Sequence, residues 1–425
     1  MELTKYKLGD IADISVGFPF ESERFNENGI GIRLVRGMNV SERTLRFGDE
    51  SRWWSDITDN LEAYFLKEND IVIGMDGSKV GKNFALIKQT DLPLLLVQRV
   101  ACVRAKKGID QHYIWHYVSS PRFIEYVNTI KTGSAIPHIS GKQIGEFPIF
   151  VPPLPEQKKI ASVLSALDDK IALNKKMNQK LEAMAKRLYD YWFVQFDFPD
   201  KNGHSYKTTG GPMTYNPTLK REIPVGWEVK NVNDVTTSVR GVSYSSDDEK
   251  SKTDSNVVQI LRGNNISGSR FVFDSNDVFV SSDLVAEEQK ISKFDIVMTM
   301  SSGSKEHVGK SALALYDMPH SFGAFCSKFT PNEEAGYFID CYLHSEIFIK
   351  YIRQTCSGTG INNLTKGHFD KSLFAWPTED ILKAFNEKVS AIYEQRGVIE
   401  REIIRLTALR DKLLPLLMNG QVEVG

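Results

Sequence analysis

The chain has 425 residues, of which 41% are hydrophobic and 25% are charged, and its formal net charge is −1. This composition is that of a folded globular protein and excludes a disordered or fibrous chain, while the near-neutral charge argues against a protein that holds nucleic acid by bulk electrostatics. The length predicts roughly two to four domains. No apolar run approaches the ~18 residues that span a bilayer, and residues 1–10 lack the apolar core of a signal peptide, so we expect a cytoplasmic protein.

The dominant pattern is an internal repeat, with a shift of about 225 residues between its two copies. Residues 32–40 read IRLVRGMNV and residues 258–266 read VQILRGNNI, while Asp70-Ile-Val recurs as Asp295-Ile-Val. The match continues through loops and into long helical stretches. The repeating unit is therefore predicted to be a globule followed by a helix.

Each globule is predicted to mix strands and helices. Alternating apolar residues at 70–75 indicate a strand, and the spacing at 113–130 and 337–352 indicates helices. Aromatic residues recur at matching helix positions, and this spacing favours burial in a core over stacking on bases. The pairs are Tyr117 with Tyr342, Phe123 with Phe348, and Tyr126 with Tyr351. The predicted fold class is therefore α+β.

Beyond each globule the apolar residues step by four and three positions, as along the contact line of a coiled coil. This predicted seam contains Ile160, Leu164, Leu167, Ile171, Leu181 and Leu188 in the first helix, and Val389, Ile392, Ile399, Leu406 and Leu413 in the second. We expect the two helices to pair. Polar residues on the seam, at positions 174, 178, 396 and 410, either fix the register of the pair or mark a partly exposed seam.

The length of the helices suggests a mechanical role. A helix over residues 155–193 would be ~57 Å long. Such a helix suits a spacer between two globules that address DNA segments about one helical turn, ~34 Å, apart.

Three stretches of the chain carry a family resemblance. Residues 149–161 read IFVPPLPEQKKIA, residues 196–200 read FDFPD, and residues 221–227 read REIPVGW after the pair Gly210-Gly211. They resemble the conserved helix and the central linker of type I restriction-modification specificity subunits, and the resemblance covers essentially the whole chain. The central linker is its most specific part.

The resemblance implies two globular target-recognition domains separated by two long antiparallel coiled-coil helices, in a pseudo-twofold internal repeat. The implied segments are 1–153 for recognition domain 1, 154–195 for the central conserved helix, 196–222 for a linker, 223–377 for recognition domain 2, and 378–425 for the C-terminal conserved helix.

The resemblance also implies a role. This would be a non-catalytic subunit of a DNA methylation and restriction system, reading a bipartite double-stranded DNA target with one half-site per recognition domain. Two modification subunits would bind along its helices, and motor-nuclease restriction subunits would complete the complex. S-adenosylmethionine, ATP and Mg²⁺ are expected in those partners, and no cofactor is expected in this chain.

Two domains that read different half-sites should share the residues that hold phosphates and differ where they meet base edges. The shared loop residues, predicted to contact phosphate or to position the loops, are Arg36, Asn39, Lys79, Lys82, Arg262, Asn265, Lys305 and Lys310. The differing residues of the glycine-rich turns, predicted to read bases, are Ser134, His138, Ser140, Thr359, Asn363 and Thr365. The segments 41–60 and 267–289 diverge most and could equally carry the readout.

The sequence gives little support to other sites. His112 and His116 lie four residues apart, but no neighbouring ligand completes a metal site, and the four cysteines form no CxxC pair. Residues 303–311 resemble a P-loop but place five residues between the glycines where the motif needs four. No catalytic residue is assigned.

Two alternative functions stay open. One is a coiled-coil scaffold that reads no DNA. The other is a self-sufficient restriction enzyme, which the absence of methyltransferase and nuclease motifs in the sequence opposes.

Overall fold

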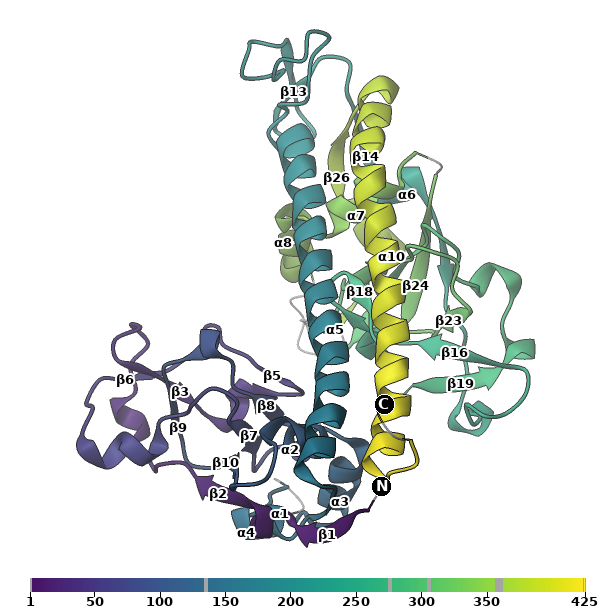
Figure 1. Cartoon of the computed structure of the whole chain (residues 1–425). Helices are drawn as coiled ribbons and strands as arrows, with labels where there is room; N and C mark the ends of the chain where they lie inside the picture. The colour runs from purple at the N-terminus through teal and green to yellow at the C-terminus, as the bar shows by residue number, and fades with distance from the viewer. Residues whose placement is uncertain are drawn as a thin grey trace. The chain divides into compact units, whose positions relative to one another are not determined.

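The structure is a computed structural model, and it divides into two compact units. Unit 1 contains residues 1–173 and 403–425, and unit 2 contains residues 174–402. Both units mix helices and strands (Figure 1), which confirms the predicted α+β class. No described helix is both long and apolar enough to cross a membrane. The described residues are 2–424 except 134–136, 274–276, 304–306, 333, 356–361 and 423.

Unit 1 is built on a four-stranded antiparallel sheet. Its strand order is β2 (Ala12–Val16), β10 (Val100–Ala105), β7 (Ile71–Gly74) and β8 (Phe84–Leu86). A second sheet has the order β6 (Trp53–Trp54), β3 (Ile32–Val35) and β9 (Leu94–Leu96), with β3 and β9 parallel. Two further antiparallel pairs are β1 (Thr4–Lys7) with β11 (Pro148–Val151), and β4 (Val40–Ser41) with β5 (Thr44–Leu45).

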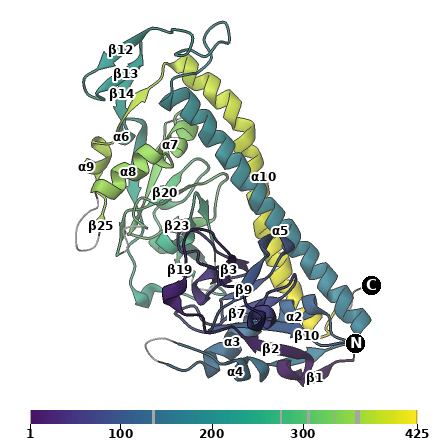
Figure 2. The same cartoon turned by 90° about the vertical axis from the view of Figure 1, so that its left-hand side faces the viewer.

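Short helices cover the sheets of unit 1 and begin at residues suited to helix starts. They are α1 (Leu8–Ile11), α2 (Gln111–Val118), α3 (Pro121–Ile130) and α4 (Gly141–Gly145). The Asp110 carboxylate accepts a hydrogen bond from the Tyr113 N–H and so caps α2. Helix α3 begins at Pro121, where proline loses no hydrogen bond. Helix α4 lies beside α3 (Figure 2), and the Tyr126 hydroxyl donates to the Gln143 carbonyl oxygen across the contact.

Unit 2 repeats this arrangement with the same strand orders. The main sheet is β15 (Thr236–Arg240), β24 (Cys326–Pro331), β20 (Ile296–Thr299) and β22 (Ser311–Leu313). The second sheet is β19 (Val278–Ser281), β16 (Val257–Leu261) and β23 (His320–Phe322), with β16 and β23 parallel. The outer pairs are β14 (Glu228–Asn231) with β26 (Leu373–Trp376), and β17 (Ile266–Ser267) with β18 (Arg270–Phe271). Two copies of one topology confirm the internal repeat.

The helices of unit 2 also follow the order found in unit 1. They are α6 (Val232–Val235), α7 (Gly336–Leu343), α8 (Glu346–Thr355), α9 (Lys366–Asp370) and the first part of the long α10 (Glu379–Met418), whose residues from 403 onward belong to unit 1. Unit 2 adds two pairs of strands, β12 (Met213–Asn216) with β13 (Arg221–Pro224), and β21 (Ser301–Ser302) with β25 (Asn362–Asn363).

The recurring aromatic residues lie in the hydrophobic cores, as predicted. Tyr117, Phe123, Tyr342 and Phe348 are at most 3% exposed, and their partners at positions 126 and 351 are partly buried. Burial of such rings is a main source of folding free energy, because each removes a large apolar area from water. These residues therefore stabilise the globules and are not available to stack on bases.

The two long helices run antiparallel wherever they meet inside a unit. In unit 1, Asp168 of α5 (Leu154–Tyr189) forms an ion pair with Arg410 of α10. In unit 2, the Asn174 side chain donates to the Glu402 carboxylate at 2.9 Å, and the Trp192 ring packs against Phe385. As the residue numbers rise along α5, the numbers of the contacting residues in α10 fall. Every residue of the predicted seam is buried or partly buried.

Three of the four polar seam residues are buried as well: Asn174 is 1% exposed, and Asn178 and Arg396 are each 2% exposed. Their burial favours the first of the two predicted alternatives. Polar side chains held inside a helix pair disfavour shifted registers, because a shift would leave them without partners.

The central linker motif has a structural explanation. Phe196 is fully buried, and the guanidinium of Arg221 lies over its ring at 4.5 Å. Phe198 stacks on both Tyr206 and Trp227, with ring centroids 4.5 and 5.3 Å apart. The residues that carry the family resemblance in this stretch therefore form an aromatic cluster of unit 2.

Candidate nucleic-acid interface

Asn39 and Asn265 occupy equivalent turns, where they organise the backbone. The Asn39 side-chain oxygen accepts from the Arg36 N–H at 3.1 Å, and its amide donates to the Arg46 carbonyl at 3.2 Å. Asn265 accepts from the Arg262 N–H at 3.0 Å in the same way. Each side chain is 1% exposed. Both asparagines thus serve loop architecture, one of the two roles predicted for them, because their polar atoms form hydrogen bonds inside the loop. Contact with phosphate stays a prediction.

Alanine at position 39 or 265 is expected to lower the free energy of unfolding by about 2 kcal/mol, because buried backbone groups lose their hydrogen-bond partner. Urea unfolding, followed by hydrogen exchange in each unit, measures the loss. Lys79→Ala is a matched control, since Lys79 is exposed and should change stability by less than about 0.5 kcal/mol. Equal effects at all three positions would contradict the assignment.

The side chains of the two arginines in these turns are partly buried. The guanidinium of Arg36 donates to the Glu50 carbonyl oxygen at 3.0 Å, and partial burial lowers its pKa. Arg262 begins the equivalent turn in unit 2 and is likewise partly buried. Both arginines stay candidates for contact with phosphate.

Lys79, Lys82 and Lys310 lie in the loops that follow the central strands β7 and β20. Lys79 is exposed, whereas Lys82 and Lys310 are partly buried. The ammonium nitrogen of Lys310 lies 3.4 Å from the Nδ1 atom of His307. Lys305 lies outside the described residues. Lysines next to glycine turns suit phosphate contacts, and these residues remain candidates.

Backbone hydrogen bonds hold three loops of unit 1 together at one edge of the main sheet. The Met75 N–H donates to the Arg99 carbonyl at 2.9 Å, and the Ile139 N–H donates to the Met75 carbonyl at 2.8 Å. His138 is exposed in this loop cluster, and its backbone pairs with Asp76. The ring of His138 also lies 3.2 Å from the Thr132 hydroxyl.

Unit 2 builds the equivalent loop cluster with different side chains. The Met300 N–H donates to the Phe325 carbonyl at 2.8 Å, and the Leu364 N–H donates to the Met300 carbonyl at 2.7 Å. Asn363 is exposed and pairs in register with Ser301. The structure thus brings the predicted base readers His138 and Asn363 to equivalent places.

The remaining predicted readers are placed less favourably. Ser140 and Thr365 occupy the N-cap positions of α4 and α9. The Ser140 hydroxyl accepts from the Gln143 N–H, and the Thr365 hydroxyl lies 2.8 Å from the His368 Nδ1 atom. Both hydroxyls therefore already serve the start of a helix. Ser134 and Thr359 lie outside the described residues.

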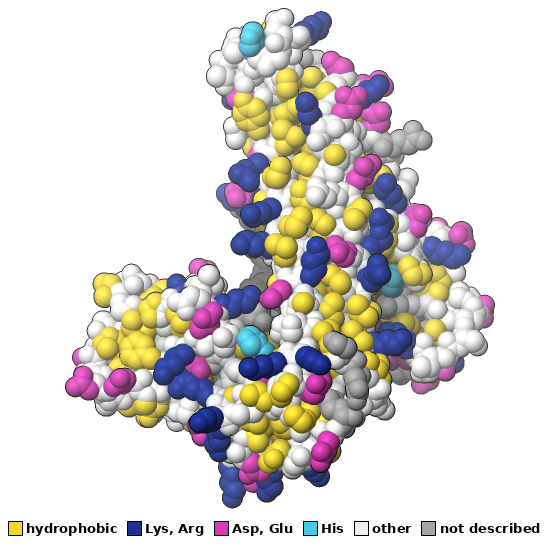
Figure 3. Space-filling view, in the orientation of Figure 1, with side chains coloured by type: hydrophobic (Ala, Val, Ile, Leu, Met, Phe, Trp, Pro, Cys, Tyr) yellow, Lys and Arg dark blue, Asp and Glu magenta, His cyan; other side chains and the backbone are white. Residues whose placement is uncertain are grey.

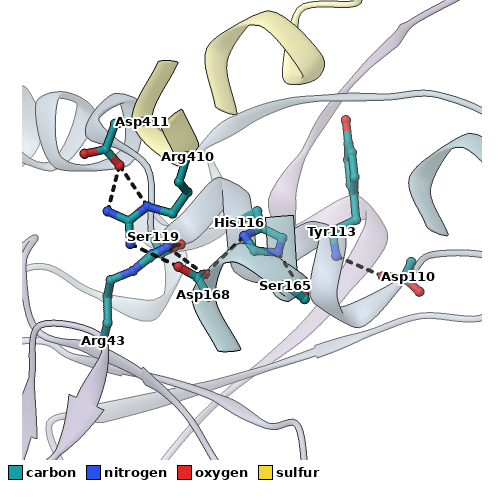
Figure 4. A network of polar contacts seen from close by, with 9 residues as sticks. All are labelled: Arg43, Asp110, Tyr113, His116, Ser119, Ser165, Asp168, Arg410 and Asp411. Atoms are coloured by element: carbon teal, nitrogen blue, oxygen red, sulfur yellow. Dashed lines mark hydrogen bonds and ion pairs between the residues drawn. The ribbon is translucent and has the colours of Figure 1, made fainter. Parts of the chain in front are cut away.

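Sequence reasoning missed a partly buried ion network in unit 1 (Figure 4). The Asp168 carboxylate accepts from Arg43 at 3.2 Å and from Arg410 at 3.0 Å. His116 lies against the same carboxylate, with its Nδ1 atom 3.8 Å away, and its Nε2 atom is 3.1 Å from the Ser165 hydroxyl. The network joins the β4–β5 turn and α2 to both long helices within unit 1.

His116 is neutral in this network. Its side chain is fully buried, and that burial lowers its pKa to about 3 although Asp168 acts in the opposite direction. A neutral, packed imidazole fits the structural interpretation of the His112 and His116 pair. Among the described residues, no group of three or more His, Cys, Asp or Glu side chains is arranged to hold a metal ion.

Unit 2 has a polar cluster at the equivalent place, built from other residues. Buried Asp340 of α7 accepts from the Tyr393 hydroxyl at 2.7 Å and lies 3.9 Å from the guanidinium of Arg396. Arg396 also reaches toward Ser269 of the β17–β18 turn at 3.5 Å and toward Glu182 at 3.9 Å. In unit 1 one arginine, Arg43, comes from the turn and another, Arg410, comes from α10. In unit 2 Arg396 comes from α10, and the turn contributes Ser269.

Comparison with known proteins finds relatives of one kind. A family model described as the type I restriction modification DNA specificity domain matches residues 2–183. The chain is 28% identical to the MjaIX specificity subunit of Methanocaldococcus jannaschii over 78% of this chain and 74% of that one. It is 36% identical to the EcoKI specificity subunit of Escherichia coli over 48% of this chain and 44% of that one.

A solved structure supports the fold. The S subunit of a type I restriction-modification system from M. genitalium superposes with a TM-score of 0.55 at 15% identity, covering 98% of this chain and 96% of that one. None of these comparisons favours the scaffold alternative. Residues 2–183 therefore match the type I restriction modification DNA specificity domain, and the chain is similar to type I restriction enzyme specificity subunits.

Proposed function

We propose that this chain reads a bipartite double-stranded DNA target, with residues 1–153 reading one half-site and residues 223–377 the other. The observation that carries the proposal is the pair of loop clusters. One backbone arrangement occurs twice, yet it presents His138 in unit 1 and Asn363 in unit 2. Repeated scaffolds with different exposed side chains are what two independent readers of different sequences require.

The helices 154–195 and 378–425 act in this proposal as the spacer and as the docking site for two modification subunits, with residues 196–222 as the linker. Figure 3 shows hydrophobic side chains along the exposed face of the long helices. Leu173, Met184, Val398 and Leu409 are each at least 41% exposed. Exposed apolar side chains on both helices support the proposal that a partner covers this surface.

The chemistry of the system then belongs to the partners. Modification subunits would bind S-adenosylmethionine and methylate adenine, and restriction subunits would use ATP and Mg²⁺ to move along and cleave DNA. This chain contributes recognition and assembly.

A map of methylated adenines tests the proposal. In cells that express this chain with its modification subunit, we expect a split motif with a fixed gap. A chimaera in which residues 1–153 come from another family member should change the first half of the motif and leave the second half unchanged. A complex that assembles but methylates no defined motif would refute the proposed reading of DNA and favour the scaffold function.

A further inference from the structure

One loop position differs between the two loop clusters in a way that folding does not require. The loop before β10 carries Arg99, and the loop before β24 carries Phe325. Both residues use the same backbone contact, because the carbonyl of Arg99 accepts from Met75 N–H and the carbonyl of Phe325 accepts from Met300 N–H. The backbone role is shared, whereas one side chain is a cation and the other an apolar ring.

Phe325 is exposed to an unusual degree. It is 70% exposed, more than any other large hydrophobic residue that the structure describes. Because the equivalent loop of unit 1 closes with an arginine at this position, the ring is not needed to close the loop. An exposed phenyl group beside Asn363 is suited to an apolar contact in a DNA groove.

The side chain of Arg99 is exposed, and an ion pair fixes its orientation. Its side chain is 67% exposed, and its guanidinium donates to the Asp76 carboxylate at 2.9 Å. Its backbone has a φ of 68°, in the left-handed region that favours glycine. Residues held in such conformations cluster at functional sites. A guanidinium fixed at one nitrogen by a carboxylate is preorganised to present its other donors.

Asp76, which pairs with Arg99 in unit 1, is also replaced by another residue in unit 2. Asp76 occupies the position of Ser301 in unit 2, since the backbone of Asp76 pairs with His138 and that of Ser301 pairs with Asn363. The orienting carboxylate is therefore present in the unit that has the arginine and is replaced by a small hydroxyl in the unit that has the phenylalanine. The two positions differ as a pair.

We propose that Arg99 and Phe325 determine base specificity, Arg99 by hydrogen bonding a guanine in the major groove of the first half-site and Phe325 by contacting a thymine methyl group in the second. Asp76 acts as a positioning residue for Arg99. Arginine matches the O6 and N7 acceptors of guanine, and an aromatic ring matches the thymine methyl group. The inference rests on the proposed function, because it names the residues through which two half-sites are read.

Two single variants test the proposal in the assembled methyltransferase. Arg99→Ala should make one G·C position of the first half-site degenerate and lower discrimination there by about 5- to 150-fold, with the second half-site unchanged. Phe325→Ala should relax one A·T position of the second half-site and leave the first unchanged. The readout is the motif of methylated adenines and the binding of duplexes that carry single base changes.

Base analogues separate direct contact from a change in loop shape. At the relaxed positions, 7-deazaguanine should weaken binding of the wild-type complex but not of Arg99→Ala. Uracil in place of thymine should weaken the wild-type complex by about fourfold, the effect of one buried methyl group, but should not weaken Phe325→Ala. Asp76→Asn should weaken the preference for guanine while retaining its direction.

Matched controls lie outside the loop clusters. Arg24 is an exposed arginine paired with Asp56 in unit 1, and Tyr215 is a 63% exposed aromatic residue on β12 in unit 2. Their alanine variants should leave the motif unchanged. A wild-type motif that Arg99→Ala and Phe325→Ala do not alter would overturn this inference alone. Absence of any motif with the wild-type complex would overturn the proposed function, and this inference with it.

Discussion

Replacing Asp168 by asparagine is expected to destabilise unit 1 by about 3 kcal/mol, close to the cost of removing one partner from a buried ion pair after allowance for its partial exposure. The Asp168 side chain is 21% exposed, and it lies between Arg43 and Arg410, whose side chains are 20% and 15% exposed. Asparagine keeps the size of the side chain but removes the charge. The two guanidinium groups would then face each other without the carboxylate, and their repulsion adds to the lost hydrogen bonds.

Hydrogen exchange of α2 amides in unit 1, compared with α7 amides in unit 2, measures the effect, because a loss confined to unit 1 should leave α7 protected. Asp411→Asn supplies the matched control. Asp411 pairs with Arg410 on the same helix at 2.7 Å, but its side chain is 57% exposed, so water screens the interaction and the expected loss is below about 1 kcal/mol. Equal losses for the two variants would show that burial of the network contributes nothing.

The network illustrates which parts of the fold the sequence could predict. The repeat, the mixed globules and the long helices follow from local periodicity, and each was found. Arg43 and Asp168 are 125 residues apart, and Arg43 has no equivalent arginine in the second copy, where Ser269 occupies the turn. Long-range polar pairs leave no periodic signal in one sequence, so neither the partners nor the burial of this network could be predicted.

The candidate DNA interface could also be predicted only in part from the sequence. Asn39 and Asn265 were singled out because both copies share them, but such sharing arises from contacts with phosphate and also from loop architecture. Burial separates the two, and burial in a turn depends on the fold. Arg99 and Phe325 were missed because their loops have little sequence in common. An alignment of the two copies on their flanking strands would have placed Arg99 opposite Phe325. That difference between the copies was the available signal.

The stability of unit 2 is expected to fall as the pH rises from about 6.5 to 9, because His344 carries a proton that the fold requires. Its Nδ1 atom lies 2.7 Å from the Asp340 carbonyl oxygen, and its Nε2 atom lies 3.1 Å from the Ser311 carbonyl oxygen. Both neighbours are acceptors, so both ring nitrogens must donate, and only the imidazolium can do this. The Asp340 carboxylate, 3.2 Å from Nδ1, adds an opposite charge.

Burial by itself would lower the pKa of His344, but the charge of Asp340 and the hydrogen bonds to Asp340 and Ser311 raise it to about 9. In the unfolded chain the pKa of histidine is about 6.5. The stabilisation is therefore complete below pH 6.5 and is lost as the pH rises through 9. A shift of this size corresponds to about 2–3 kcal/mol after allowance for the coupling between His344 and Asp340.

Neighbouring groups keep their protons across this window. Burial raises the pKa of Cys341 and of Tyr393, and Arg396 stays charged. Hydrogen exchange of α7 amides between pH 6.5 and 9, corrected for the intrinsic rate, measures the decline. His344→Gln should lower stability at pH 6.5 and abolish the decline, since glutamine cannot titrate.

His320→Gln is the matched control in the same unit, because burial lowers the pKa of His320 to about 4 and this residue is neutral throughout the window. That variant should retain the full decline. If instead the wild-type protein and His344→Gln lost stability equally between pH 6.5 and 9, the proton on His344 would not hold α7 to β22. The positive charge beside Asp340 would then come from Arg396. In unit 1 the positive charge beside Asp168 likewise comes from arginines, Arg43 and Arg410.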